Sequence, residues 1–201
     1  MDLIKISNKL DAKLVVDRFK RGDIGVILTD TIYGLSCLAD NSSAISMVYK
    51  IKNRPKNYSF IILVSDFLML KKYFLVSKEQ EDFLRKSWLD KNSRPTTFIL
   101  NIKDEFANKF GVKKSNGVAV RLPKNDFLVK IIQSVKSPLI STSCNLSGRK
   151  EVSSLREIIS LFKFNKYKPD FIVNYNKIRS RRKPSAIMDI RRFPFVKLIR
   201  S

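Results

Sequence analysis

The stretch VAVRLPKNDFLVKIIQSVKSPLISTSCNLSG, residues 118 to 148, decides the predicted fold. It opens with a short apolar run, 118–121, of the length and composition typical of a strand. Apolar residues then recur on one helical face, which predicts a helix beginning at Asn125 or Asp126. A second apolar run, 138–140, follows and predicts another strand. The unit is therefore strand, helix, strand, which indicates an α/β protein.

The polar run that ends this unit is a candidate binding site. Ser141–Gly148 offers hydroxyls and an amide directly after an apolar strand. Ligands of open α/β sheets usually sit beyond the carboxyl ends of strands, which favours a small-molecule site here. A cluster of Ser, Thr and Asn before Gly is also an ordinary turn signal, so this run alone leaves both interpretations open.

Helical and strand-like segments alternate through the rest of the chain, without an internal repeat. The 201 residues and their 44% hydrophobic content suit one well-cored domain spanning 1–201. Closely spaced strands near the C-terminus predict a mixed sheet flanked by helices. Further helices are expected over 11–21, from a cap at Ser42 or Ser43 to just before Arg54, over 68–73 and 78–89, and from Ser154. Further strands are expected over 24–28, 59–64, 97–100, 171–173, 186–188 and 195–199.

Composition excludes several kinds of catalytic site. The chain has no histidine, which excludes a Ser-His-Asp or Cys-His nucleophile and a His-ligated zinc. Cys37 and Cys144 are too few for a metal knuckle and are expected to be small buried side chains. No run is long and apolar enough for a membrane span, and no secretory signal opens the chain, so we expect a cytoplasmic protein without membrane contact.

Charge points to anionic partners. Forty Lys and Arg against 18 Asp and Glu give a net charge of +22. Such a surface attracts nucleotides and binds RNA phosphates in a salt-sensitive way. Lysines spread along the whole chain could equally form an ordinary solvated surface, so nucleic-acid binding stays open.

Two further features suggest a site for anions. Lys52 and Arg54 lie at the end of a predicted helix, where they could hold a triphosphate or simply form a solvated helix end. Arg121 ends an otherwise apolar strand, and because Arg is rarely buried unless paired, it suits a ligand carboxylate. Hydroxyls also follow a strand in the run Thr29–Leu35.

Together these segments resemble the YrdC/TsaC family of bacterial L-threonylcarbamoyladenylate synthases, from about Gly22 to the C-terminus. The order and spacing of several motifs carry the resemblance. They are Thr-x-Thr-x-Tyr-Gly-Leu at 29–35, Lys-x-Arg at Lys52 and Arg54, Val-Ala-Val-Arg-x-Pro at 118–123, Ser-x-Asn at Ser143 and Asn145, and Pro184-Ser185.

The resemblance implies a YrdC-like twisted mixed sheet in a single domain and a nucleotidyltransferase reaction. L-Threonine, bicarbonate or CO2 and ATP, with Mg²⁺ accompanying the nucleotide, would give threonylcarbamoyl-adenylate and pyrophosphate. A downstream transferase complex would use that product to make N6-threonylcarbamoyladenosine (t6A) in tRNA. The absence of histidine agrees with this chemistry, because an anionic carbamate needs orientation and charge neutralisation more than a base.

The resemblance also assigns residues. The catalytic set is Lys52, Arg54, Ser143 and Asn145; the threonine-binding set is Thr31, Arg121, Ser143 and Ser185; the ATP-binding set is Lys52, Arg54, Tyr58, Asn145, Ser153 and Arg200. Ser153 could instead begin a helix, and Ser185 could simply begin a strand. Tyr58 stands where the family often has Asn, and its ring could stack on adenine or cover the pocket.

Two alternatives remain at this level. A YciO-like paralogue would share the fold but lose parts of the Lys-x-Arg and Ser-x-Asn sets, which are intact here. A non-catalytic RNA-binding or ribosome-associated module would use the basic charge and keep the pocket only as a relic.

Overall fold

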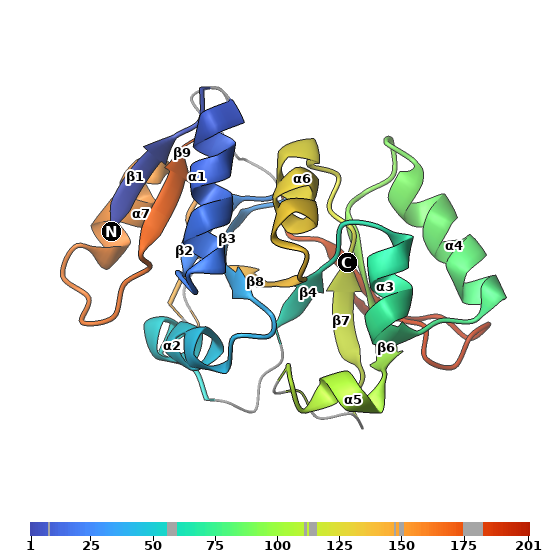
Figure 1. Cartoon of the computed structure of the whole chain (residues 1–201). Coiled ribbons are helices and arrows are strands. Elements are labelled where there is room, and N and C mark those ends of the chain that lie inside the picture. The colour runs from blue at the N-terminus through green and yellow to red at the C-terminus, as the bar shows by residue number, and fades with distance from the viewer. Residues whose placement is uncertain are drawn as a thin grey trace.

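A computed structural model describes residues 1–7, 9–55, 60–110, 112, 116–146, 148, 151–174 and 183–201, and shows a single mixed α/β domain (Figure 1). The strands are β1 (Asp2–Lys5), β2 (Gly25–Leu28), β3 (Tyr33–Leu38), β4 (Ile61–Leu63), β5 (Phe74–Leu75), β6 (Thr96–Ile102), β7 (Val118–Arg121), β8 (Leu139–Ser143), β9 (Phe171–Asn174), β10 (Ala186–Asp189) and β11 (Lys197–Arg200). The helices are α1 (Lys9–Lys20), α2 (Ser42–Lys52), α3 (Phe67–Tyr73), α4 (Lys78–Leu89), α5 (Asp104–Ala107), α6 (Asp126–Val135) and α7 (Leu155–Phe162).

The strands form one mixed sheet, as the sequence predicted. Its order is β1-β9-β2-β3-β8-β4-β7-β6-β10-β11, and β5 pairs with β6 beside this path. Strands β4 and β7 run parallel, whereas β8 is antiparallel to both of its neighbours, β3 and β4. The centre of the sheet therefore brings together strands from distant parts of the sequence.

The predicted unit over residues 118 to 148 is present as β7, α6 and β8. Asn125 caps the start of α6 by accepting a hydrogen bond from the Leu128 amide at 3.1 Å. Lys136 is the C-cap, and its φ of 56° is left-handed. Strand β4 lies between β7 and β8 in the sheet. The helix thus carries the chain over β4 and reverses its direction, so the end of β8 faces the start of β3.

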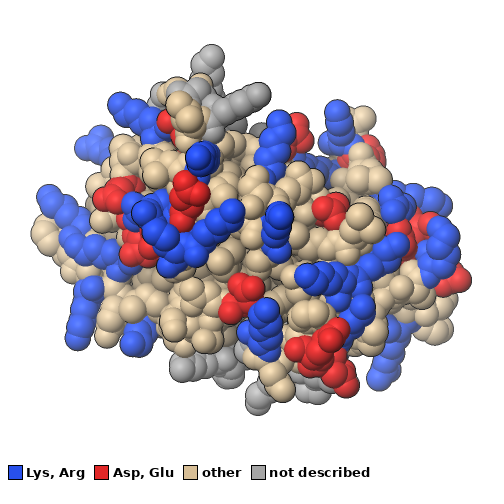
Figure 2. Space-filling view, viewed as in Figure 1, with Lys and Arg blue, Asp and Glu red and all other residues tan. Residues whose placement is uncertain are grey.

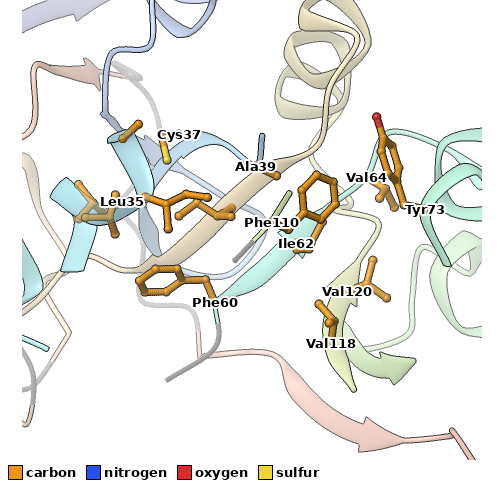
Figure 3. Packing of buried hydrophobic residues seen from close by; sticks show 14 of the residues in the cluster. Leu35, Cys37, Ala39, Phe60, Ile62, Val64, Tyr73, Phe110, Val118 and Val120 are labelled. Carbon is orange, nitrogen blue, oxygen red and sulfur yellow. The ribbon is translucent and has the colours of Figure 1, made fainter. Parts of the chain in front are cut away.

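Apolar side chains fill both faces of the sheet. Helices α1 and α6 pack against each other over one face. The other face holds the larger cluster, to which α2, α4 and α7 contribute buried side chains. Figure 3 shows part of this cluster, where Leu35, Ile62 and Val120 come from three different strands. Burial of this apolar surface stabilises the central strands that carry the polar residues described below.

Several local expectations need correction. Ser141–Ser143 belong to β8 and do not follow it, because their backbone pairs with β3 and β4. Strand β3, Tyr33–Leu38, was not predicted and begins inside the hydroxyl-rich run Thr29–Leu35. Helix α2 is capped by Asn41, whose side chain accepts from the Ala44 amide, and not by Ser42 or Ser43. Strands β1 and β5 and helix α5 were not predicted.

The prediction that both cysteines are small buried side chains is confirmed, because Cys37 and Cys144 are buried and form no disulfide. Burial raises the pKa of the Cys144 thiol to about 12, which keeps it protonated. Within the described part of the chain, no helix is both long and apolar enough to cross a bilayer.

Candidate active site

A cavity of about 290 Å³ opens where the central strands meet the C-terminal hairpin. Its walls combine hydroxyl groups with arginines and one carboxylate, that of Glu151. Six of the residues predicted from the sequence lie on this wall: Thr31, Arg54, Arg121, Ser143, Ser185 and Arg200. They come from the β2–β3 connection, the end of α2, β7, β8, the approach to β10 and β11. The fold therefore gathers distant segments around one polar cavity.

Arg121 is the most buried charged residue that lines the cavity. Its side chain is 4% exposed, and its Nη2 atom lies 3.2 Å from Oδ1 of Asp30. Its Nη1 atom donates to the Thr31 hydroxyl at 3.3 Å, while its Nε atom has no hydrogen-bond partner in the described residues. Burial lowers the pKa of Arg121, and the charge of Asp30 opposes that shift. A buried guanidinium with an unused donor is suited to bind an anionic oxygen.

Thr31 is held by its neighbour on the same turn. The hydroxyls of Thr29 and Thr31 lie 2.9 Å apart, and the Thr29 hydroxyl donates to the Ile32 carbonyl at 2.8 Å. The turn exists because β2 pairs antiparallel with β3 directly after it. These contacts fix the orientation of the Thr31 hydroxyl beside Arg121.

The opposite wall is tied to the C-terminal strand. Arg200 donates from Nε and Nη2 to the Ser185 carbonyl, at 3.2 and 2.9 Å. The Ser185 hydroxyl lies 2.8 Å from that of Thr97, so Ser185 is anchored through both its side chain and its backbone. Partial burial lowers the pKa of Arg200, while the nearby charge of Glu151 raises it. The guanidinium of Arg200 thus lies along the cavity wall and leaves its charge available to an anion.

The Ser-x-Asn motif forms a turn closed by Lys52. The Lys52 ammonium lies 2.7 Å from the Ser143 carbonyl, 2.7 Å from the Asn145 carbonyl and 2.6 Å from Asn145 Oδ1. The Ser143 hydroxyl also donates to Asn145 Oδ1 at 2.7 Å. Burial lowers the pKa of Lys52 to about 8, whereas Glu151 raises it. Lys52 and Asn145 therefore lie behind the cavity wall and support Ser143, which lines it.

One predicted ATP contact lies away from the cavity, and another falls outside the described residues. Ser153 does not line the cavity; its amide and hydroxyl contact the carboxylate of Glu157 in the first turn of α7. The N-cap of that helix is Ser154. Tyr58 lies outside the described residues. The nucleotide-binding roles of both residues remain predictions.

The chain matches a known family over most of its length. The Sua5/YciO/YrdC family model, which carries the description "telomere recombination", matches residues 17–201. This chain belongs to the Sua5/YciO/YrdC family.

Individual Sua5/YciO/YrdC proteins resemble the chain in sequence and in structure. A threonylcarbamoyl-AMP synthase of Neisseria meningitidis serogroup A is 29% identical over 85% of this chain and 86% of the relative. The structure of P. abyssi Sua5 complexed with L-threonine superposes with a TM-score of 0.83 at 22% identity and covers 99% of this chain. E. coli YciO superposes with a TM-score of 0.80 at 20% identity and covers 100% of this chain and 94% of its own. The chain spans only 56% of the length of that Sua5 chain.

Two acidic residues of this Sua5/YciO/YrdC site were not predicted. Asp30 pairs with Arg121, and its Oδ2 atom accepts the Lys124 amide at 3.1 Å. Glu151 lines the cavity among arginines. Asp30 stands inside the Thr-x-Thr motif, two residues after the end of β2, and that position could have marked it. No local pattern marks Glu151, because its place depends on how the Ser-x-Asn turn leads into α7.

The basic charge of this family member is distributed and not confined to the cavity. Figure 2 shows Lys and Arg side chains spread over the viewed face, with acidic groups between them. This distribution favours the solvated-surface interpretation for the face shown. The cavity differs from that face, because three arginines, Arg54, Arg121 and Arg200, line it together.

Proposed function

We propose that the protein is a threonylcarbamoyl-AMP synthase, an enzyme that makes L-threonylcarbamoyladenylate and pyrophosphate from L-threonine, bicarbonate or CO2, and ATP. One observation carries the proposal: a single cavity joins a buried arginine, Arg121, to two further arginines, Arg54 and Arg200. That arrangement suits one small carboxylate and one polyphosphate held together. The name of the N. meningitidis relative supports the same activity.

L-Threonine would occupy the Arg121 end of the cavity. Its carboxylate would accept from the unused Nε donor of Arg121, and the hydroxyls of Thr31, Ser143 and Ser185 would complete the subsite. Because these groups sit on strands and tight turns, the amino acid would be held in one orientation. Fixed orientation supplies much of the rate acceleration in reactions between two bound molecules.

ATP would lie with its phosphates toward Arg54 and Arg200, and Asn145, behind the cavity wall, would support the nucleotide side through its bond to Ser143. The threonine amine first adds to the carbon of CO2 or bicarbonate and gives a carbamate; the CO2 route releases one amine proton to solvent, and the bicarbonate route releases water. A carbamate oxygen then attacks the α-phosphorus. A new oxygen–phosphorus bond forms, the bond to the α–β bridging oxygen breaks, and its electron pair leaves with pyrophosphate. The arginines would stabilise the charge that develops on the phosphates.

Magnesium would enter with the nucleotide. No group of three or more acidic or cysteine side chains suited to a metal occurs among the described residues. Mg²⁺ is commonly held by one or two carboxylates together with substrate phosphates, and Glu151 is the carboxylate on the described wall. When bound, the ion would neutralise phosphate charge, with Glu151 as its protein ligand.

The product would serve tRNA modification. Threonylcarbamoyl-adenylate is an activated mixed anhydride, so a transferase complex must collect it for transfer to adenosine in tRNA. We place this activity in the cytoplasm, and direct contact with tRNA through the basic surface forms part of the proposal. A YciO-like activity or a non-catalytic RNA-binding role are the alternatives that the experiment below separates.

The decisive experiment follows labelled bicarbonate into product. Purified protein is incubated with ATP, Mg²⁺, L-threonine and labelled bicarbonate, and the adenylate and pyrophosphate are separated by chromatography. We expect equal amounts of both, dependent on threonine. Salt-sensitive RNA binding without any adenylate would favour the RNA-binding module, and pyrophosphate release independent of threonine would favour a different activity of the paralogue type.

A further inference from the structure

The Lys-x-Arg pair divides into two different environments. Arg54 lines the cavity, whereas Lys52 is 3% exposed and is not part of the lining. The two residues lie on either side of the end of α2. Asn53 between them has a left-handed φ of 48°, and this conformation ends the helix and separates the two side chains. Charge alone would assign both cations to phosphate, but their surroundings differ.

A lysine ammonium has three N–H donors and no acceptor. Three oxygens surround that of Lys52 within 2.7 Å: the carbonyls of Ser143 and Asn145, and Oδ1 of Asn145. The Ser143 hydroxyl is a more distant neighbour at 3.5 Å. All three donors are therefore used by one turn of the chain, and none is left for a phosphate.

The turn that Lys52 holds faces the substrate. Ser143 lines the cavity, and its backbone pairs with Gly34, another residue of the wall. One more sheet bond follows Ser143, from the Cys144 amide to the Tyr33 carbonyl at 2.9 Å, and beyond it the chain leaves the ladder of β8. From there the hydrogen bonds of one ammonium to two carbonyls and one side-chain oxygen hold the turn. Hydrogen bonds with a charged donor are stronger than neutral ones, which suits this role.

We propose that Lys52 is a positioning residue that fixes the Ser143–Asn145 turn, and that Arg54 is the member of the pair that contacts the phosphates of ATP. The inference rests on the proposed function and refines it. It implies that loss of Lys52 affects threonine as well as nucleotide, because Ser143 belongs to the threonine side. Loss of Arg54 affects only those ligands that carry phosphates.

Binding of L-threonine alone, measured by calorimetry without nucleotide, separates the two roles. We expect Lys52→Met to weaken threonine binding about 10-fold or more, and Arg54→Met to change it less than about 2-fold. Lys50→Met, on the exposed side of the same helix, is the matched control and should bind as the wild type does. Unchanged threonine affinity in Lys52→Met would overturn the inference. If the wild type itself binds no threonine, the proposed function fails, which is a different result.

Comparison of ATP with adenosine tests the phosphate role. The ratio of the two affinities measures what the phosphates contribute. We expect that ratio to fall about 10-fold or more in Arg54→Met and to persist in Lys52→Met. A ratio that collapses in Lys52→Met and persists in Arg54→Met would overturn the assignment.

A second variant guards against misfolding of Lys52→Met. Lys52→Arg keeps the positive charge but presents a planar fork of donors that does not match three converging oxygens. A phosphate-binding role would tolerate this change, whereas the positioning role predicts weakened threonine binding in a folded protein. Circular dichroism establishes folding, and full threonine affinity in Lys52→Arg would contradict the proposal.

Discussion

Arg121 and Asp30 form an ion pair in the interior, with Nη2 and Oδ1 3.2 Å apart and side chains 4% and 2% exposed. The pair joins the end of β7 to the turn after β2. Asp30 also accepts the backbone amide of Lys124, so the carboxylate is fixed from two sides. This arrangement holds the Arg121 guanidinium against the cavity wall and explains why its charge is tolerated there.

Asp30→Asn should destabilise the protein and weaken threonine binding. The substitution leaves Arg121 buried without its counter-charge, which costs about 3 to 5 kcal/mol when one partner of a buried pair is removed. Urea unfolding measures the first effect and calorimetry with L-threonine the second. Asp82→Asn is the control, because its pair with Lys78 is exposed to solvent and should contribute little to stability. Equal stability of the two variants would show that the buried pair does not act as described.

Gly34→Ala should close part of the cavity. A Cβ atom at Gly34 would lie 2.4 Å from the Ser141 hydroxyl oxygen and 3.3 Å from Thr29 Cγ2, both on the cavity wall. We expect threonine affinity to fall about 10-fold or more while the fold is retained, since one displaced hydroxyl relieves the contact. Adding Ser141→Ala should recover part of the affinity. Failure of the double variant to improve on Gly34→Ala would place the obstruction elsewhere.

Threonine binding should weaken as the pH rises above about 8. Burial lowers the pKa of Lys52 to about 8 from its ordinary 10.5; Arg54 adds to that shift, and Glu151 and Cys144 oppose it. The ammonium that holds the Ser143–Asn145 turn is therefore lost between pH 8 and 10.5, where a lysine in the unfolded chain stays protonated. In that window the unfolded state binds more protons than the folded state, so the free energy of unfolding rises with pH. Over the same range the turn loses the N–H donors of the Lys52 ammonium, so threonine binding weakens although the fold does not.

The ratio of threonine affinities of wild type and Lys52→Arg isolates this titration, because the substrate titrates equally in both measurements. Arg stays protonated throughout this range. We expect the ratio to fall about 10-fold between about pH 7.5 and about pH 9.5. A constant ratio would show that the charge of Lys52 is not needed by the turn.

Glu151→Gln should raise the concentration of Mg²⁺ needed for activity. Glu151 is the carboxylate on the described cavity wall, and the amide of Gln is a weaker magnesium ligand. We expect about 10-fold weaker binding of Mg²⁺ in the presence of ATP, followed with Mn²⁺ as a paramagnetic substitute. Glu157→Gln, on the nearby helix α7 and outside the cavity lining, serves as the control. Identical metal dependence in the two variants would remove Glu151 from the metal site.

Apolar periodicity predicted the long elements of the fold well. Helix α6 and strand β7 lie where the pattern placed them, because their side chains face a continuous core. Strand β1 was missed, since three of its four residues are exposed and its pairing with β9 is a long-range contact. Strand β3 was missed because it begins inside the polar motif at 29–35, and its Gly34 and Ser36 pair with β8.

The sequence predicted a set of site residues, but not which of them line the cavity and which lie behind its wall. Motifs indicated Arg121 and Ser143, the family resemblance indicated Arg200, and the cavity brings these three together. Motif spacing could not indicate that Lys52 turns away from the cavity. That orientation depends on the carbonyls of a turn that begins at Ser143, 91 residues later in the chain. Long-range backbone contacts of this kind leave no periodic signal in a sequence.

The central claim is that one cavity holds the amino acid and the nucleotide side by side. A crystal structure of the protein with L-threonine and a non-hydrolysable ATP analogue tests it most directly. We predict the threonine carboxylate at Arg121 and the phosphates at Arg54 and Arg200, with the amine directed at the α-phosphate. Ligands found on separate faces, or phosphates bound by Lys52 with the Ser143–Asn145 turn opened, would contradict the account.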